Sequence, residues 1–166
     1  KSTLVNFIIC EIEKITKSDE TIILPFNPWM FSGQKELQNI FLNKLIRKLR
    51  SKKEKFKEIL VKFDKFLTHL EKIKYLHSGL GELASDAKGA LEGLNNDTSL
   101  EDLKSEIDSL LIQNKVKLYI TIDDIDRLMP QEIINIFQLV KLNANFSNTV
   151  FILIYDKSIV IEALNK

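Results

Sequence analysis

Three short runs of strand character alternate with longer segments of helical periodicity, and this alternation limits the fold more than any other feature. The runs are 21–24 (TIIL), 119–122 (YITI) and 150–155 (VFILIY). The third run is apolar throughout, which is typical of a strand covered on both faces. Strands that alternate with helices predict an α/β protein with a parallel sheet.

The first helical segment, about residues 2–17, is apolar on nearly every side. Its apolar residues at helical spacing are Leu4, Val5, Phe7, Ile8, Ile9, Ile12 and Ile15. A helix of this kind is normally buried, so we expect it to lie inside the core. Cys10, the only cysteine, falls in the same segment. A disulfide framework is therefore excluded, and the cytoplasm is the default compartment.

Two prolines interrupt the chain after the first strand. Pro25 ends the run 21–24, and Pro28 follows Asn27. Both favour extended or turn geometry and exclude a helix before about residue 33. An amphipathic helix is predicted next, with apolar positions at Leu37, Ile40, Phe41, Leu45 and Leu49.

The middle of the chain predicts an antiparallel helical excursion from the sheet. A heptad-like apolar seam covers 56–73, and a second seam with smaller residues covers 83–94. Eight lysines lie between residues 52 and 74. They either contact phosphates or a partner, or form a solvated face. We divide the single domain into a first core part (1–50), a helical insertion (51–97) and a second core part (98–166).

Capping signals mark the helices of the second half. Thr98 and Glu101 have the spacing of a capping box, which predicts a helix through about residue 111. Pro130 fits the first turn of a helix that runs to about residue 144. A last helix is expected from about Ser158.

Composition narrows the function classes. The 24 Lys and Arg residues nearly balance the 23 Asp and Glu residues, and the net charge is +1. Charge therefore gives no support to binding of nucleic acid or of an anionic membrane. No apolar run approaches the roughly 20 residues that cross a bilayer. The sequence begins with lysine and not methionine, so we interpret it as a fragment and draw nothing from the lack of targeting signals.

Two adjacent carboxylates, Asp123 and Asp124, directly follow the run 119–122. Ligands of parallel sheets bind outside the carboxyl ends of the strands. In P-loop NTPases, an Asp at this position (the Walker B site) holds the Mg²⁺ that bridges the nucleotide phosphates. The other interpretation is a strand followed by a solvated acidic turn.

The opening residues favour the nucleotide interpretation. Lys1-Ser2-Thr3 matches the end of the phosphate-binding motif G-x-x-x-x-G-K-[ST], and an apolar helix follows, as it does after such a loop. A Lys-Ser pair alone carries little information. The two ends of the chain taken together predict a nucleotide site.

Three segments resemble the KAP family of P-loop NTPases, which is related to the AAA+ and STAND ATPases. They are FNPWMFSG (26–33), ITIDDIDRLMPQEI (120–133) and FILIYD (151–156). The resemblance implies a sheet order of 5-1-4-3-2. This chain would hold strands 2, 3 and 4 of a partial three-layer sandwich, without strand 1, its phosphate loop or strand 5. Some KAP members carry membrane helices where this chain has its insertion, and others are implicated in phage exclusion.

The resemblance implies ATP and Mg²⁺ as ligands and assigns roles to matching residues. Lys1 would lie between the β- and γ-phosphates. Ser2 and Asp123 would hold Mg²⁺, which needs few protein oxygens. Asp124 would orient or deprotonate the attacking water, and its short side chain predicts slow turnover. The alternative role of Asp124 is a hydrogen bond to a neighbouring loop.

Thr3, Arg127 and Asp156 complete the candidate set. Thr3 is assigned to nucleotide binding together with the Lys-Ser pair before it. Arg127 either braces the strand-to-helix turn or faces the γ-phosphate of a neighbouring subunit as an arginine finger. Asp156, at the end of the third run, either senses the γ-phosphate or caps the next helix.

We expect the intact protein to be an ATP-hydrolysing, nucleotide-dependent switch, with a family-level link to anti-phage defence. The alternative is a non-hydrolysing scaffold whose helical insertion docks a partner. Besides nucleotide, we expect a protein partner or a homo-oligomer. A weaker third hypothesis is an ATPase that nucleic acid stimulates through the lysines of the insertion. The 166 residues alone should be inactive, because the phosphate loop is missing and the edge of the strand 150–155 is left open.

Overall fold

The computed structural model describes residues 2–16, 20–33, 37–51, 56–77, 99–143 and 145–165. Within them, three parallel strands form one sheet in the order β1-β2-β3. The strands are β1 (Thr21–Phe26), β2 (Lys117–Ile122) and β3 (Thr149–Leu153). The predicted α/β fold class is confirmed, and the strand order agrees with the 4-3-2 part of the expected sheet.

The strand register aligns the carboxyl ends of the three strands. Ile122 of β2 lies opposite both Phe26 of β1 and Leu153 of β3. The backbone N–H of Asp123 then donates to the carbonyl of Phe26 at 3.1 Å. The residues that leave β1, β2 and β3 therefore emerge together at one edge of the sheet.

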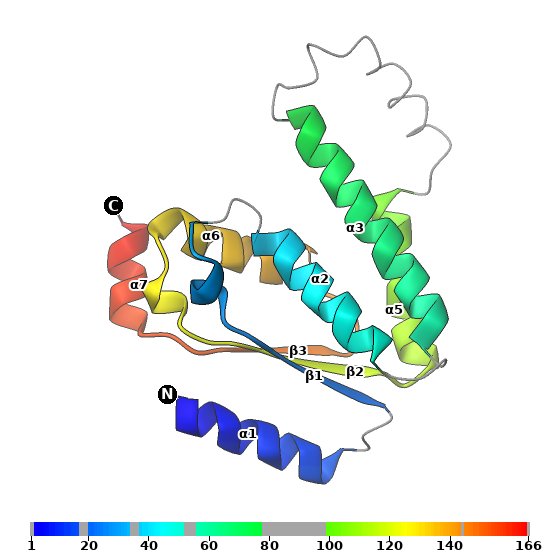
Figure 1. The fold of residues 1–166 in the computed structure, drawn as a ribbon, viewed down its shortest axis with the longest axis horizontal. Helices are drawn as coiled ribbons and strands as arrows, with labels where there is room; N and C mark the ends of the chain where they lie inside the picture. The colour runs from blue at the N-terminus through cyan, green and yellow to red at the C-terminus, as the bar shows by residue number, and fades with distance from the viewer. Residues whose placement is uncertain are drawn as a thin grey trace.

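Helices and short helical turns make up the other elements. In chain order they are α1 (Ser2–Ile15), the 3₁₀ turn η1 (Pro28–Phe31), α2 (Leu37–Arg50), α3 (Lys57–His77), α5 (Leu100–Gln113), the 3₁₀ turn η4 (Ile125–Arg127), α6 (Pro130–Gln138), the π-turn η5 (Leu139–Asn143) and α7 (Lys157–Leu164). Figure 1 shows α2 and α6 on one face of the sheet and α1 on the other. The helices α3 and α5 pack against each other and extend away from the sheet.

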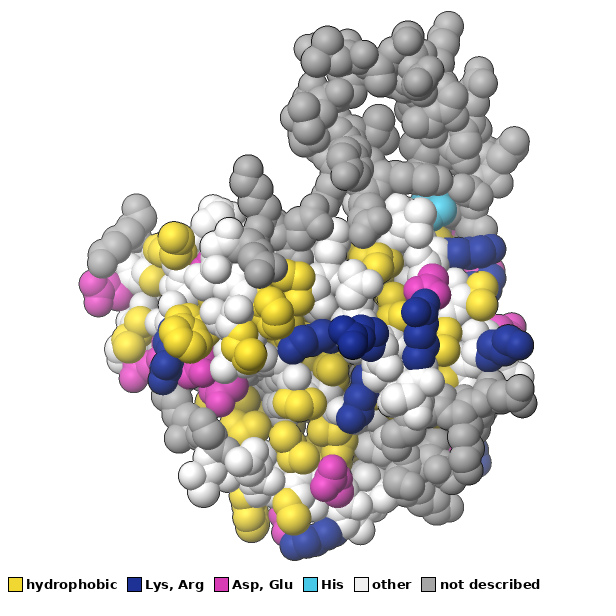
Figure 2. Space-filling model, viewed as in Figure 1, with side chains coloured by type: hydrophobic (Ala, Val, Ile, Leu, Met, Phe, Trp, Pro, Cys, Tyr) yellow, Lys and Arg dark blue, Asp and Glu magenta, His cyan; other side chains and the backbone are white. Residues whose placement is uncertain are grey.

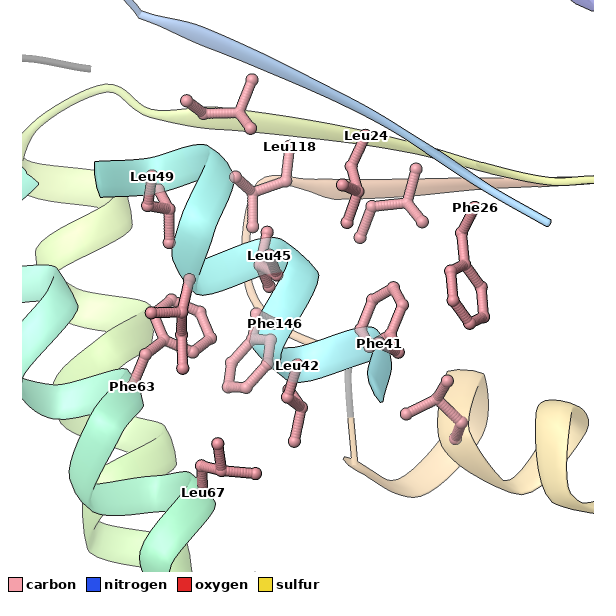
Figure 3. Packing of buried hydrophobic residues seen from close by; sticks show 14 of the residues in the cluster. Leu24, Phe26, Phe41, Leu42, Leu45, Leu49, Phe63, Leu67, Leu118 and Phe146 are labelled. Atoms are coloured by element: carbon pink, nitrogen blue, oxygen red, sulfur yellow. The ribbon is translucent and has the colours of Figure 1, made fainter. Parts of the chain in front are cut away.

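The core lies between the sheet and the face of α2 that bears its apolar residues. Phe41 of α2 is fully buried beside Phe26 (Figure 3). Its ring centroid lies 5.4 Å from that of Phe26 and 6.4 Å from that of Phe151. The core continues into the α3–α5 pair, where Phe63 contacts Phe146 with centroids 4.9 Å apart. One apolar cluster thus joins the strands to the projecting helices.

The expectation that the first helix is buried is wrong. Val5 and Ile12 of α1 are buried, but Leu4, Phe7 and Ile15 are each more than 60% exposed. A helix that lies on a sheet buries one stripe only. Among the described residues, no second layer covers the outer side of α1 (Figure 1). Most of the apolar side chains of α1 therefore stay at least partly exposed, although the sequence of this helix is apolar on nearly every side.

The expectation that the third strand is covered on both faces is also wrong. Phe151 of β3 points toward α2, so the alternation of side chains directs Val150 to the opposite face, where it is 47% exposed. In the described part of the chain, β3 pairs with β2 along one edge and with no strand along the other.

Two local expectations are shifted. β1 continues through Pro25 to Phe26, because β1 lies at the edge of the sheet formed by the described residues, where a proline is tolerated. The capping box before α5 is formed by Ser99 and Asp102 instead of Thr98 and Glu101. Ser99 accepts from the Asp102 N–H at 3.1 Å. Both Thr98 and Ser99 have an acid three positions on. Thr98 lies outside the described residues.

The structure describes part of the helical insertion. Lys62 of α3 pairs with Glu106 of α5 at 2.6 Å, and Arg50 pairs with Asp64 at 2.9 Å. Lys62 thus holds two helices together, which favours the structural interpretation for this lysine. The seam at 83–94 lies outside the described residues, and the domain boundaries stay a prediction. Of the helices that are described, none is long and apolar enough to cross a membrane.

Replacing Phe41 by Ala should lower the free energy of unfolding by about 3–5 kcal/mol, because a cavity opens between α2 and the sheet. The matched change Phe7→Ala on the exposed side of α1 should change it by less than about 0.5 kcal/mol. Unfolding in urea measures both values. Equal losses would contradict the packing of Phe41 between α2 and the strands.

Candidate functional site

Asp123 lies directly after the central strand β2 and is half-buried. Its Oδ1 accepts the backbone N–H of Asp124 at 2.8 Å. Its Oδ2 has no hydrogen-bond or ion-pair partner among the described residues. One carboxylate oxygen at the carboxyl end of the sheet is therefore available for a cation or a water molecule.

Asp124 has a different environment from that of its neighbour. Its φ of 60° is in the left-handed region, which Asp adopts more readily than most residues. Its Oδ2 accepts from Asn27 Nδ2 at 2.7 Å, and its Oδ1 pairs with Arg127 Nε at 3.0 Å. Both oxygens of Asp124 are thus engaged, as the alternative role of a hydrogen bond to a neighbouring loop requires.

Arg127 braces the turn after β2. It pairs with Asp124, and its guanidinium carbon lies 5.3 Å from the ring centroid of Trp29. Both the Arg127 and Trp29 side chains are about half exposed. Each contact contributes at most about 1 kcal/mol at such exposure. The bracing interpretation of Arg127 is what the geometry shows, and the arginine-finger role stays a prediction.

Glu132 of α6 is a buried carboxylate that the sequence reasoning missed. Its side chain accepts hydrogen bonds from Gly33 N at 2.7 Å, Ser32 Oγ at 2.9 Å and Met129 N at 2.9 Å. Burial alone would raise the pKa of Glu132, but these three donors lower the pKa below its ordinary value. The available signal was an acid at the third position of a helix that begins with Pro130.

Asp156 caps α7. Its Oδ1 accepts the backbone N–H groups of Ser158 at 2.9 Å and Ile159 at 3.4 Å. The capping interpretation is confirmed, whereas sensing of a γ-phosphate stays a prediction. Asp156 does follow β3, so it belongs to the same edge of the sheet as Asp123.

The amino end of α1 lies at the same end of the molecule as the carboxyl ends of the strands. α1 runs opposite to β1 (Figure 1). Its 14 residues span about 21 Å, and the 6 residues of β1 span about 20 Å. Thr3, in the first turn of α1, is exposed. Lys1 and the side chain of Ser2 lie outside the described part of the chain.

The single free carboxylate oxygen of Asp123 suits Mg²⁺, and it does not suit a metal ion that needs three or more protein ligands. Mg²⁺ uses one or two carboxylates together with phosphates and waters. One free carboxylate oxygen of Asp123 meets that need, and Ser2 is the matching hydroxyl candidate. Within the described residues, no group of three His, Cys, Asp or Glu side chains is placed to hold a metal ion.

Charge is unevenly distributed over the surface around this edge. Figure 2 shows Lys and Arg side chains over α2 and acidic side chains gathered near α7 and the strand ends. The basic residues of the last turn of α2 are Arg47, Lys48 and Arg50, which complement the negative end of that helix. The basic surface on α2 therefore has a structural explanation, and the acidic surface coincides with the candidate site.

Arg127→Gln should make Trp29 more accessible to acrylamide, because the guanidinium no longer covers the ring. Trp29 is the only tryptophan in the sequence, so quenching of its fluorescence reports on this contact. The exposed residue Arg47 supplies the control variant Arg47→Gln, which should leave quenching unchanged. Identical quenching in both variants and the wild type would show that Arg127 does not cover Trp29 in solution.

Comparison with known proteins supports a family assignment. Residues 1–166 match the KAP family P-loop domain. The chain is 25% identical over 192 residues to the phage T7 exclusion protein of Escherichia coli (strain K12), and the match covers 99% of this chain and 25% of that protein. The chain thus spans about a quarter of the length of this relative. No solved structure matches it significantly. The match along the whole sequence, together with the strand order and the acids after β2, shows that this chain belongs to the KAP family of P-loop NTPase domains.

Proposed function

We propose that this domain binds Mg²⁺ and ATP at the carboxyl end of its sheet and hydrolyses the nucleotide as a switch. Family membership supports nucleotide binding in general terms. The observation that carries the finer proposal is the free Oδ2 of Asp123 at the end of the central strand. In a P-loop NTPase, this position holds the magnesium that bridges the phosphates.

The proposed roles divide the site between the two ends of the sequence. Lys1 neutralises charge between the β- and γ-phosphates, and Thr3 supports the same phosphate-binding turn. Ser2 and Asp123 hold Mg²⁺, which screens the phosphate charge that builds up during hydrolysis. The direction of α1, which returns its amino end to the strand ends, supports this convergence.

Asp124 is the proposed acceptor for the proton of the attacking water. The water oxygen forms a bond to the γ-phosphorus while the bond to the β,γ-bridging oxygen breaks, and ADP leaves. In the structure, Asn27 and Arg127 engage both oxygens of Asp124, so neither oxygen is free to bind the attacking water. Hydrolysis is therefore slow until these contacts change, which suits a switch more than a pump.

The proposed setting is defence against phage in the cytoplasm. The support is the name of the relative, a phage T7 exclusion protein that is 25% identical to this chain. The nucleotide state would be passed to a protein partner or a second copy of the chain. Asp156, which follows β3, is the proposed contact for sensing the γ-phosphate, and Arg127, which is exposed, is the proposed contact for a neighbouring subunit.

A non-hydrolysing scaffold is the second candidate. The engagement of both Asp124 oxygens favours it, because an acid whose oxygens stay engaged is not free to bind the attacking water. In this case, nucleotide binding would only stabilise the fold, and the α3–α5 pair would dock a protein partner. Stimulation by nucleic acid has weaker support, since Lys62 is paired with Glu106.

Asp123→Asn in the full-length protein should abolish magnesium-dependent ATP binding, with turnover reduced by at least about a hundredfold. The amide keeps the size of the side chain but loses the charge that attracts the cation. Asp64→Asn, which changes an acid on α3 that pairs with Arg50, should keep both binding and turnover. Titration calorimetry with and without Mg²⁺ measures binding. Wild-type affinity in Asp123→Asn would remove Asp123 from the site.

Asp124→Asn should leave ATP affinity within about threefold of the wild type and lower the hydrolysis rate by about 10²–10⁴-fold, the usual contribution of a general base. Phosphate release under steady-state conditions measures the rate, again with Asp64→Asn as control. A wild-type rate in Asp124→Asn would favour the scaffold over the switch.

A further inference from the structure

Two loop segments that are far apart in the sequence are tied to each other at both ends. The first is 27–33, which leaves β1, and the second is 124–132, which leaves the end of β2 and enters α6. At the start, Asn27 donates to Asp124 at 2.7 Å. At the end, Ser32 and Gly33 both donate to Glu132. Between these ties, Trp29 contacts Arg127.

The contacts of Glu132 exceed what capping α6 requires. A cap at this position needs only the hydrogen bond from Met129 N. Glu132 also accepts from Ser32 Oγ and Gly33 N, which are about a hundred positions away in the sequence. The residue is only 8% exposed, and hydrogen bonds to a charged, buried acceptor are among the stronger ones in proteins.

The backbone of the segment 27–33 is shaped to reach Glu132. Gly33 has a φ of +84°, a conformation that residues with a side chain rarely adopt, and its N–H lies 2.7 Å from Glu132 Oε1. A Cβ added there would meet nothing within 4 Å. Glycine is therefore favoured at this position for its backbone conformation, which turns the N–H toward the carboxylate.

We propose that Glu132 is a positioning residue for the candidate site. It anchors the end of the segment 27–33, and this anchor sets where Asn27 and Trp29 meet Asp124 and Arg127. Loss of the anchor frees the segment and loosens the contacts that hold both oxygens of Asp124. The consequence for hydrolysis rests on the proposed function, whereas the anchoring itself does not.

Glu132→Gln in the full-length protein tests this role. Gly33 N and Met129 N donate to different oxygens of Glu132, and an amide keeps only one of these oxygens, so one of the two backbone N–H groups loses its acceptor. Hydrogen exchange followed by mass spectrometry, without nucleotide, should show peptides over 27–33 exchanging at least about tenfold faster. Peptides over α5 should be unchanged. The control Glu101→Gln makes the same change at an exposed position in the first turn of α5 and should leave 27–33 unchanged.

The kinetic readout separates positioning from loss of fold. Glu132→Gln should raise kcat for ATP hydrolysis by at least about fivefold, because the contacts that hold Asp124 are loosened, and should change KM by less than about twofold, since Asp123 keeps its contact with Phe26. Faster exchange at 27–33 with an unchanged kcat would overturn the catalytic part of the proposal. If the wild type hydrolyses no ATP, the proposed function fails, and the exchange result still decides the anchoring.

A milder variant decides the outcome if Glu132→Gln does not fold. Ser32→Ala removes one donor to Glu132 at an exposed position and should speed exchange confined to 27–33 by a smaller factor. Unchanged exchange at 27–33 in Glu132→Gln overturns the proposal. Unchanged exchange in Ser32→Ala overturns it as well if Glu132→Gln is unfolded.

Discussion

The parallel register of the sheet determines where the residues that follow each strand lie. Ile122 lies opposite both Phe26 and Leu153, so three strands end at one level. Asn27 and Asp124 meet there although they are 97 positions apart. The register is itself fixed by burial, because a shift by one residue would move the apolar side chains that face α2 to the opposite side of the sheet.

The two adjacent acids at this edge have different surroundings, and this contrast supports the different roles that we propose for them. Asp123 keeps one oxygen without a partner among the described residues, whereas Asp124 is held by an amide and a guanidinium. Pairs of acids in unlike environments often divide the work of a site in this way. The first acid is suited to a cation, and the second is suited to a step that waits for a change in its partners. The hydrogen bonds from Ser32 and Gly33 to Glu132 hold the segment 27–33, which carries Asn27, one of the partners of Asp124.

Much of the fold follows from local patterns, and the rest depends on partners that a sequence does not display. Apolar periodicity and strand ends correctly predicted the parallel sheet and placed Asp123 and Asp124 at the edge where its strands end. The burial of α1 was predicted wrongly, because periodicity measures the hydrophobicity of a helix and not how many neighbours cover it. Glu132 was missed because two of its three donors lie about a hundred positions away. The contact of Arg127 with Trp29 was missed for the same reason.

Every proposed role depends on the amino end of α1 and the acids after β2 meeting around one magnesium triphosphate. The most direct test is an experimental structure of the full-length protein with Mg²⁺ and a non-hydrolysable ATP analogue. We predict magnesium at the carboxyl end of β2, about 2.0–2.1 Å from Ser2 Oγ and bound to Asp123 Oδ2 directly or through one water. Nucleotide bound elsewhere, or a metal with no contact to either residue, would contradict this prediction.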